Sequence, residues 1–294
     1  MSFQIAHGIN YDGGHDEDHG LTEDGEIIHV PHHRHEVSMD LTETQVSVQH
    51  ALTDRWIATL RVPFSNRVQE TGVVPVAPAT PEEIEAMERN GTIHHRDETF
   101  RGIGDVKLLF GMQQTSWLRE GDWFLGSAGL TVPFGETEED PWIAGARGEK
   151  HTHPQLGTGT FDPLLELRYG MPLSDRVSAL GGAQARLPVY ENSKTYEGPL
   201  DLRVDAGAIL SLGGSWSGLV GYDLLVQGYS HWNGVRDKNS GIVSHSVRVG
   251  AGTAAGGLGL QLSAFFPFAQ DLLQDEGDGF EQGPTFLLSV GRGW

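Results

Sequence analysis

Hydrophobic and polar residues alternate along most of this chain with a period of two. Phe124, Leu130 and Val132 would share one face of an extended segment, and Ser127 and Thr131 the opposite face. The same alternation recurs at 104–113, 122–134, 199–211 and 257–268. Strict alternation is typical of β-strands with one apolar and one polar face. The pattern therefore predicts an all-β protein.

One stretch has the pattern of a helix instead. Residues 81–90 begin with Pro81, carry acidic residues in the first turn and are followed by Gly91. Proline at the start and glycine after the end are the usual helix boundaries. We expect a short helix near 81–90.

Twelve strands are expected, and the connections between them alternate in length. The strands are predicted at 2–10, 41–52, 55–65, 104–115, 121–134, 160–171, 176–190, 199–212, 215–229, 240–253, 257–269 and 283–294. Short connections lie at 52–55, 115–121, 172–176, 212–215 and 254–257, and long ones at 11–40, 66–102, 135–158, 191–198, 231–240 and 270–282. Short turns at one end and long loops at the other are typical of bacterial outer-membrane β-barrels, whose even strand number places both termini in the periplasm.

We therefore predict one domain over 1–294, a transmembrane antiparallel up-and-down β-barrel in which 11–40 and 66–102 are long outer loops. The first strand, 2–10, rests on the even count more than on its own pattern. Trp56, Trp123 and Trp216 all fall at the starts of strands that leave the short-turn end. The last strand finishes on Trp294. Aromatic residues suit the membrane interface, which supports the barrel.

The composition limits the classes of partner that the chain is expected to bind. The chain has 40 acidic against 20 basic residues and a formal net charge of −20, which argues against nucleic-acid binding. It has no cysteine, so disulfides and thiolate metal sites are excluded. We expect a bacterial outer-membrane location with lipid and lipopolysaccharide around the barrel. Since the first residues lack the pattern of a signal peptide, an exported protein is expected to have this sequence in its mature form.

Short motifs recur at the far ends of the upward strands. They are RVPF at 61–64, TVPF at 131–134, RLPV at 186–189 and FPF at 266–268, accompanied by LTDRW at 52–56, GIGDVK at 102–107 and LTVPFG at 130–135. Together they resemble the family of outer-membrane transporters labelled "MetA-pathway of phenol degradation". The resemblance runs from about residue 41 to the C-terminus and implies a barrel for passive transport. It does not extend to the histidine-rich segment 11–40.

If the apolar face of each strand contacts lipid, the opposite face lines the lumen, and its residues include both acidic and basic side chains. The expected lumen residues are Arg61, Asp105, Lys107, Glu166, Arg168, Arg186, Asp201, Arg203, Asp205, Asp223 and Arg248. Two interpretations remain open: ion pairs that fill space and fix register, or a polar conduit for small solutes. Twelve strands lie between barrels filled by side chains and barrels with wide channels, so a narrow or loop-blocked pore is expected.

Histidines concentrate in the predicted outer loops. The candidate metal ligands are His15, His19, His29, His32, His33, His35, His94 and His95. Imidazole binds Zn or Cu, and the acidic stretches 16–18 and 275–278 are weaker candidates for Ca²⁺ because they lack EF-hand spacing. Adventitious metal binding and simple solvation of the loops are the alternatives. The sequence has no HExxH motif, and the histidines are expected to lie in a flexible stretch.

An enzyme is not expected, although some outer-membrane barrels are lipid hydrolases. His245 is the one odd residue on an apolar face, and its neighbours Ser244 and Ser246 point the other way. The leading hypothesis is a channel for small solutes, such as hydrophobic or aromatic compounds or metal ions. The alternatives are a barrel that serves as a metal- or partner-binding scaffold without an open pore and, third, a hydrolase using His245. The sequence identifies neither the solute nor an oligomeric state.

Overall fold

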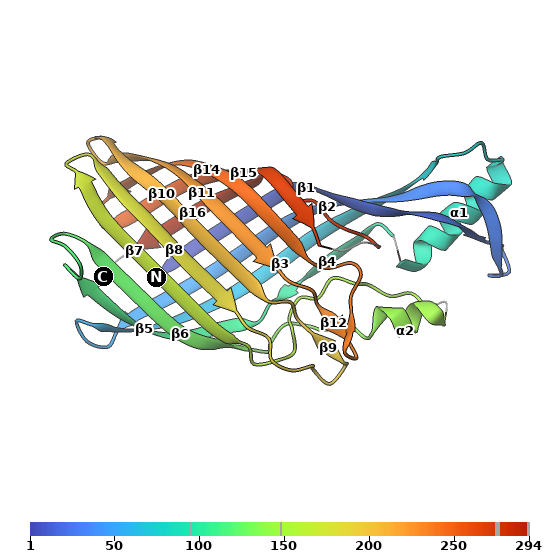
Figure 1. Ribbon diagram of the computed structural model, residues 1–294, viewed down its shortest axis with the longest axis horizontal. Helices are drawn as coiled ribbons and strands as arrows, with labels where there is room; N and C mark the ends of the chain where they lie inside the picture. The colour runs from blue at the N-terminus through green and yellow to red at the C-terminus, as the bar shows by residue number, and fades with distance from the viewer. Residues whose placement is uncertain (95, 148, 274–276, 293–294) are drawn as a thin grey trace.

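The computed structural model describes residues 1–94, 96–147, 149–273 and 277–292, and it is a closed antiparallel β-barrel (Figure 1). Twelve strands form the ring: β1 (Ser2–Leu21), β2 (Ile27–Ala51), β3 (Trp56–Pro75), β5 (Val106–Thr115), β6 (Trp123–Val132), β7 (Pro163–Ser174), β8 (Val177–Arg186), β10 (Asp201–Gly213), β11 (Trp216–Gln227), β14 (Ile242–Ala255), β15 (Leu258–Leu272) and β16 (Thr285–Arg292). Strand β4 (Glu98–Ile103) pairs with β3 beyond the start of β5. The predicted fold class and the twelve strands are confirmed.

The first strand closes the barrel. Ser2 pairs with Gly291 and Gly8 with Thr285, so β1 and β16 are hydrogen-bonded antiparallel neighbours. A closed ring leaves no strand edge in lipid, where unpaired backbone groups would each cost several kcal/mol, roughly. The strand that the even count required is therefore the one that removes both edges.

The two faces of the wall differ as the alternation predicted. On β3, the side chains of Leu60 and Phe64 point outward and are exposed, whereas Thr59 and Ser65 point inward and are almost completely buried. A row of exposed apolar side chains around a barrel is the surface that contacts lipid. The polar face of the strands consequently lines the lumen.

Both termini and the short turns lie at one end of the barrel, and the helices and long loops lie at the other (Figure 1). Trp56, Trp123 and Trp216 are the first residues of β3, β6 and β11, and all three are exposed at the short-turn end. This agrees with an interfacial aromatic belt. Trp294 lies outside the described residues.

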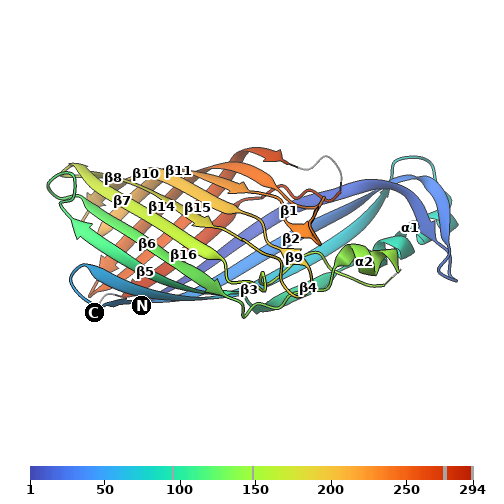
Figure 2. The ribbon, with the colours of Figure 1, turned by 60° about the horizontal axis from the view of Figure 1, so that its bottom comes forward.

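Segment 11–40 differs from the predicted loop. Strand β1 continues to Leu21 and β2 begins at Ile27, so only 22–26 forms a turn. Residues 11–21 and 27–40 form a hairpin that projects past the rim, and we call this hairpin the arm (Figures 1 and 2). The prediction was wrong because both faces of the arm are largely polar, which conceals the period of two from a hydropathy pattern.

Helix α1 (Pro81–His94) packs against the arm and confirms the helix predicted at 81–90. Its first turn is a capping box: Glu83 N–H donates to Thr80 Oγ1 at 3.3 Å, and Thr80 N–H donates to Glu83 Oε2 at 2.7 Å. Ala86 and Met87 form a small buried core with Val30 of the arm. The predicted loop 66–102 thus contains the end of β3, a helix and β4.

Two smaller elements complete the outer end. Helix α2 (Pro141–Ala146) lies in the loop between β6 and β7. Strands β9 (Tyr196–Glu197), β12 (His231–Trp232) and β13 (Val235–Arg236) form a separate three-stranded sheet. Neither helix in the described part of the chain is long and apolar enough to cross a membrane.

Candidate functional site

Four charged side chains from four strands form one network on the inner wall. Asp205 on β10 pairs with Arg168 of β7 and, at 3.4 Å, with Arg248 Nη2 of β14. Arg248 Nε also lies 3.2 Å from Asp223 Oδ2 on β11. Asp205 and Asp223 are direct partners in the β10–β11 register, so Arg248 offsets the repulsion between two adjacent carboxylates.

Glycines let these arginines reach across intervening strands. Gly182 of β8 lies between Arg168 and Asp205 in the register, and a Cβ at Gly182 would come within 2.7 Å of the Arg168 side chain. A Cβ at Gly221 would likewise lie 3.2 Å from Arg248 Nη2. The inner wall therefore combines long cationic side chains with neighbours that have no side chain, which explains part of the high glycine content.

A second group of charges lies nearer the outer end. Arg61 forms a bidentate pair with Glu166, with Nη2 donating to Oε2 at 2.8 Å, and Lys107 is the register partner of Arg61 on β5. Arg203 Nε lies 3.3 Å from Asp201 Oδ1 on its own strand. The Arg203 side chain is 62% exposed although its strand parity places it inside the barrel. A water-accessible space therefore lies within the ring.

Asp105, one of the expected lumen residues, is buried in contacts with a loop. Its carboxylate is buried and accepts hydrogen bonds from Gly135 N–H at 3.0 Å and from both the N–H and the hydroxyl of Thr158, at 2.7 and 2.9 Å. It thus ties the loop between β6 and β7 to the start of β5. Arg186 forms a neighbouring ion pair, with its Nη1 3.8 Å from the fully buried carboxylate of Asp162.

The small sheet of β9, β12 and β13 lies at the outer end of the barrel (Figure 1). Tyr196 of β9 packs against Trp232 of β12 with ring centroids 4.7 Å apart, and both side chains are buried. Tyr196 interacts electrostatically with Arg67 on β3 and Arg186 on β8, which lie on separate parts of the wall. The narrow or loop-blocked pore expected from the strand number stays a prediction, and the arm continues β1 and β2 of the wall.

On the arm, four side chains converge on one face. His15 is the register partner of His35, and Glu17 is the register partner of His33. Because residues two apart on a strand share a face, His15, Glu17, His33 and His35 form one group, which we call the arm cluster. His33 and His35 are completely buried, and His15 and Glu17 are each about one-fifth exposed.

The ring nitrogens and carboxylate of the arm cluster are close together. His33 Nε2 and His35 Nε2 are 3.0 Å apart, and Glu17 Oε2 lies 3.8 Å from His35 Nε2 and 3.7 Å from His15 Nε2. Asn90 of α1 donates to Glu17 Oε2 at 2.9 Å. Burial lowers the pKa of His15, but the hydrogen bonds to Asp278 and Glu17 outweigh it and raise that pKa to about 9.

The other predicted histidine ligands separate into different places. His32 lies on the opposite face of β2, with Nε2 3.6 Å from Asp16 Oδ2. Near the tip, Asp18 Oδ1 lies 2.9 Å from His19 Nδ1, and its other oxygen lies 3.5 Å from His29 Nδ1. His94 ends α1, and His95 lies outside the described residues.

Sequence reasoning missed Glu17 as a histidine partner and expected the histidines in a flexible stretch, whereas they lie on paired strands. The signal was present as His-x-Glu at 15–17 and His-x-His at 33–35. The calcium hypothesis for 16–18 is not supported by this geometry, because all three carboxylates pair with histidine or arginine side chains. In the second acidic stretch, Asp275 lies outside the described residues and Asp278 binds His15.

His245 lies on the outer face of β14, as its parity predicted. Its Nδ1 is 2.6 Å from the hydroxyl of Tyr222, and Phe268 is a ring neighbour at 6.2 Å. Ser244 is buried on the other face. The partner on the adjacent strand is thus a tyrosine, which makes an interfacial aromatic cluster and not a serine–histidine pair.

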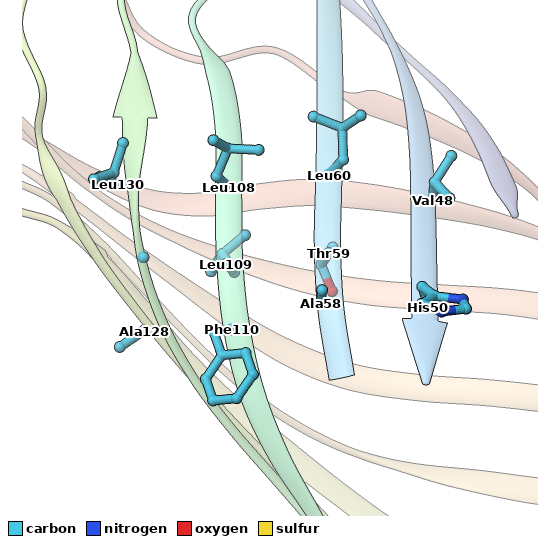
Figure 3. Close-up of a pocket in the computed structure, with 11 residues that line it drawn as sticks. Val48, His50, Ala58, Thr59, Leu60, Leu108, Leu109, Phe110, Ala128 and Leu130 are labelled. Atoms are coloured by element: carbon cyan, nitrogen blue, oxygen red, sulfur yellow. The ribbon is translucent and has the colours of Figure 1, made fainter. Parts of the chain in front are cut away.

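A shallow apolar depression also lies on the outer wall (Figure 3). Its sides are formed by Val48, Leu60, Leu108, Phe110 and Leu130, and small residues such as Ala58 and Ala128 leave the floor open. These side chains belong to the lipid-facing parity.

No protein-family model matches the chain, and no curated protein matches its sequence. Among solved structures it is similar to the COG4313 outer membrane channel from Pseudomonas putida F1, with a TM-score of 0.61 and 14% identity over 99% of this chain and 94% of that chain. A Pseudomonas aeruginosa FadL homologue gives a TM-score of 0.47 and 8% identity over 98% and 89% of the two chains. The transport unit of the autotransporter AIDA-I from Escherichia coli gives 0.46 and 9% over 100% and 90%. The first likeness agrees with the closed barrel that the family resemblance implies, and the chain has the fold of an outer-membrane β-barrel.

Proposed function

We propose that this protein is a passive channel of the bacterial outer membrane for small solutes. The observation that carries the proposal is Arg203, whose side chain faces the lumen and is 62% exposed. An inward guanidinium with that exposure requires space for water between the walls. The fold is also that of a solved protein described as an outer membrane channel.

The chemistry of the wall supports a particular class of solute. Arg61, Lys107, Arg186 and Arg203 provide cationic groups toward the outer end, and Glu166 and Asp201 lie among them. A wall of both signs favours small polar or ionic solutes over purely apolar ones, because an apolar solute gains nothing for displacing water from these groups. Aromatic compounds would pass best when they carry a polar or ionised substituent.

Single-channel recording in a planar lipid bilayer tests this proposal. We expect discrete conductance steps from refolded protein, and Arg203→Glu should shift the reversal potential in a salt gradient toward cation selectivity. Arg176→Glu, in the short turn after β7, is the matched control and should leave selectivity unchanged. Folded protein that gives no steps at any voltage would refute the channel.

A second candidate function is a binding surface on the arm, with or without an open pore. The observation that favours it is the convergence of His15, Glu17 and His35 on the arm, with His33 on the same face. Such a group suits Zn or Cu better than Ca²⁺, because nitrogen donors outnumber oxygen donors. Lipid hydrolysis has no comparable support, and unchanged lipase activity in His245→Ala protein would remove it.

A further inference from the structure

We propose that the arm cluster is a site for one tetrahedral Zn²⁺, held by His15, Glu17, His33 and His35. The inference gives the proposed binding surface of the arm a defined site and ligand. It is independent of whether the barrel conducts. Four protein ligands would leave no open coordination position, so the site would bind metal and would not activate water.

The register of the strands assembles the donors. His15 lies opposite His35 and Glu17 lies opposite His33, on one face of a two-stranded ribbon. Strand β2 pairs with β3 without any register shift from His33 to Ala51, so the position of both β2 histidines is set by a continuous ladder. The donors therefore come from hydrogen-bonded backbone and not from mobile loops, and ordered donors lose less entropy on binding.

The distances suit a small divalent cation. Zinc–nitrogen bonds of about 2.0–2.1 Å in a tetrahedron place ligand atoms about 3.3–3.4 Å apart. The observed separations are 3.0 Å between the two β2 imidazoles and 3.7 and 3.8 Å from Glu17 Oε2 to His15 and His35. Donor atoms of His15, Glu17 and His35 all lie within 4.8 Å of one another. His33 lies outside that group of three, so its Nε2, 3.0 Å from His35 Nε2, would have to move toward His15 and Glu17 to complete the tetrahedron.

A second set of contacts orients the imidazoles of His15 and His33. Asp278 Oδ1 lies 2.7 Å from His15 Nδ1, and the carbonyl oxygen of Pro31 lies 3.0 Å from His33 Nδ1. A carboxylate and a carbonyl only accept hydrogen bonds, so both Nδ1 atoms carry protons. Zinc binding would release the second proton of His15, and Nε2 of each ring would then be the ligand atom that faces the cluster. Metal-binding histidines are held in this way by carboxylates and backbone carbonyls.

Helix α1 and the exposure pattern complete the site. Asn90 donates to Glu17 Oε2 and fixes the carboxylate over the histidines, and a Cβ at Gly91 would lie 3.5 Å from His35 Cε1. His33 and His35 are shielded from water, whereas His15 and Glu17 remain partly exposed. A cation could thus enter from the side of β1 and finish in contact with the two buried rings.

Isothermal titration of metal-stripped, tag-free protein in detergent with ZnCl₂ tests the site. We expect one Zn²⁺ per chain, and about a 10- to 100-fold loss of affinity in Glu17→Gln and in His33→Gln. His32→Gln is the matched control: it is adjacent in sequence, has the same chemistry and lies on the opposite face, so it should bind as wild type does. Circular dichroism and heat-modified gel mobility would establish that each variant is folded.

Two further measurements separate a built site from scattered surface histidines. Co²⁺ in place of Zn²⁺ should give the strong visible absorption of tetrahedral coordination, and Asp278→Asn should weaken affinity about 10-fold while keeping that spectrum. Equal losses in His32→Gln and His33→Gln, several weak equivalents, or an octahedral cobalt spectrum would overturn the proposal. So would folded protein with no titratable zinc, which would leave the arm cluster as a hydrogen-bonded support for the hairpin. None of these results depends on channel conductance.

Discussion

Replacing Arg248 with alanine should destabilise the barrel strongly. Arg248 bridges Asp205 and Asp223, which are direct partners in the β10–β11 register. Its removal would leave two carboxylates side by side, although Arg168 would still pair with Asp205. Breaking a buried charge pair costs about 3–5 kcal/mol. Because the Arg248 side chain is 13% exposed and Asp223 is 24% exposed, we expect the lower end of that range, about 3 kcal/mol.

Arg203→Ala is the control within the same lumen. Arg203 is 62% exposed and pairs with Asp201 on its own strand, so its loss should cost at most about 1 kcal/mol. Urea titration of refolded protein in lipid vesicles, followed by tryptophan fluorescence, measures both free energies of unfolding. Adding Asp223→Asn to Arg248→Ala should recover about 1 kcal/mol or more, because the two sites share one network. Equal losses for Arg248→Ala and Arg203→Ala would refute the assignment of the network as a buried structural element.

Three further predictions concern the ends of the barrel. Tyr196→Ala should raise single-channel conductance, because Tyr196 and Trp232 form the packed pair of the sheet at the outer mouth. Tyr190→Ala is the control, because Tyr190 is exposed and lies outside that sheet. Equal conductance in the two variants would place the constriction elsewhere. Asp122→Ala should make the folded band on a gel less heat-resistant, because the Asp122 carboxylate accepts from the N–H groups of Trp117, Leu118 and Arg119 and from the Tyr169 hydroxyl, whereas Asp122→Asn, which keeps one acceptor oxygen, should lose less. Burial, followed by the neighbouring His151, lowers the pKa of His153 to about 4, although Asp278 and Asp140 raise it and His15 lowers it further. The folded loop therefore favours neutral His153, its contribution to stability is complete above the ordinary value of 6.5, and that contribution is lost as the pH falls toward 4. Histidine NMR titration with His153→Gln for assignment checks this, and a midpoint near 6.5 would contradict it.

The barrel could be predicted because its chemistry is repeated in every strand. Alternation along β3 and β10 separates a lipid face from a lumen face, and the parity of Arg168, Asp205 and Arg248 followed directly. The alternation could not predict which of these charges pair with one another. The pairing depends on which strands are neighbours and on glycines such as Gly182. Pairing across the ring is a tertiary property that hydropathy does not encode.

The arm was the principal difference between prediction and structure. Its strands alternate between two polar sets, with His33 and His35 on one face and His32 and Arg34 on the other. A hydrophobic pattern cannot distinguish such a ribbon from a solvated loop. The spacing of like residues could have done so, since two imidazoles two residues apart point the same way only on an extended strand.

The unbroken ladder of β2 also constrains how this protein can change during evolution. Glu43 and Ser47 in the barrel wall and His33 and His35 in the arm share one parity of a single strand. Inserting or deleting one residue between 36 and 42 would turn both histidines to the opposite side while the wall kept its own register. Relatives that retain the arm histidines should therefore differ in arm length by even numbers of residues, or carry a compensating β-bulge. Length variation among homologues thus becomes a record of whether the inner face of the arm was under selection.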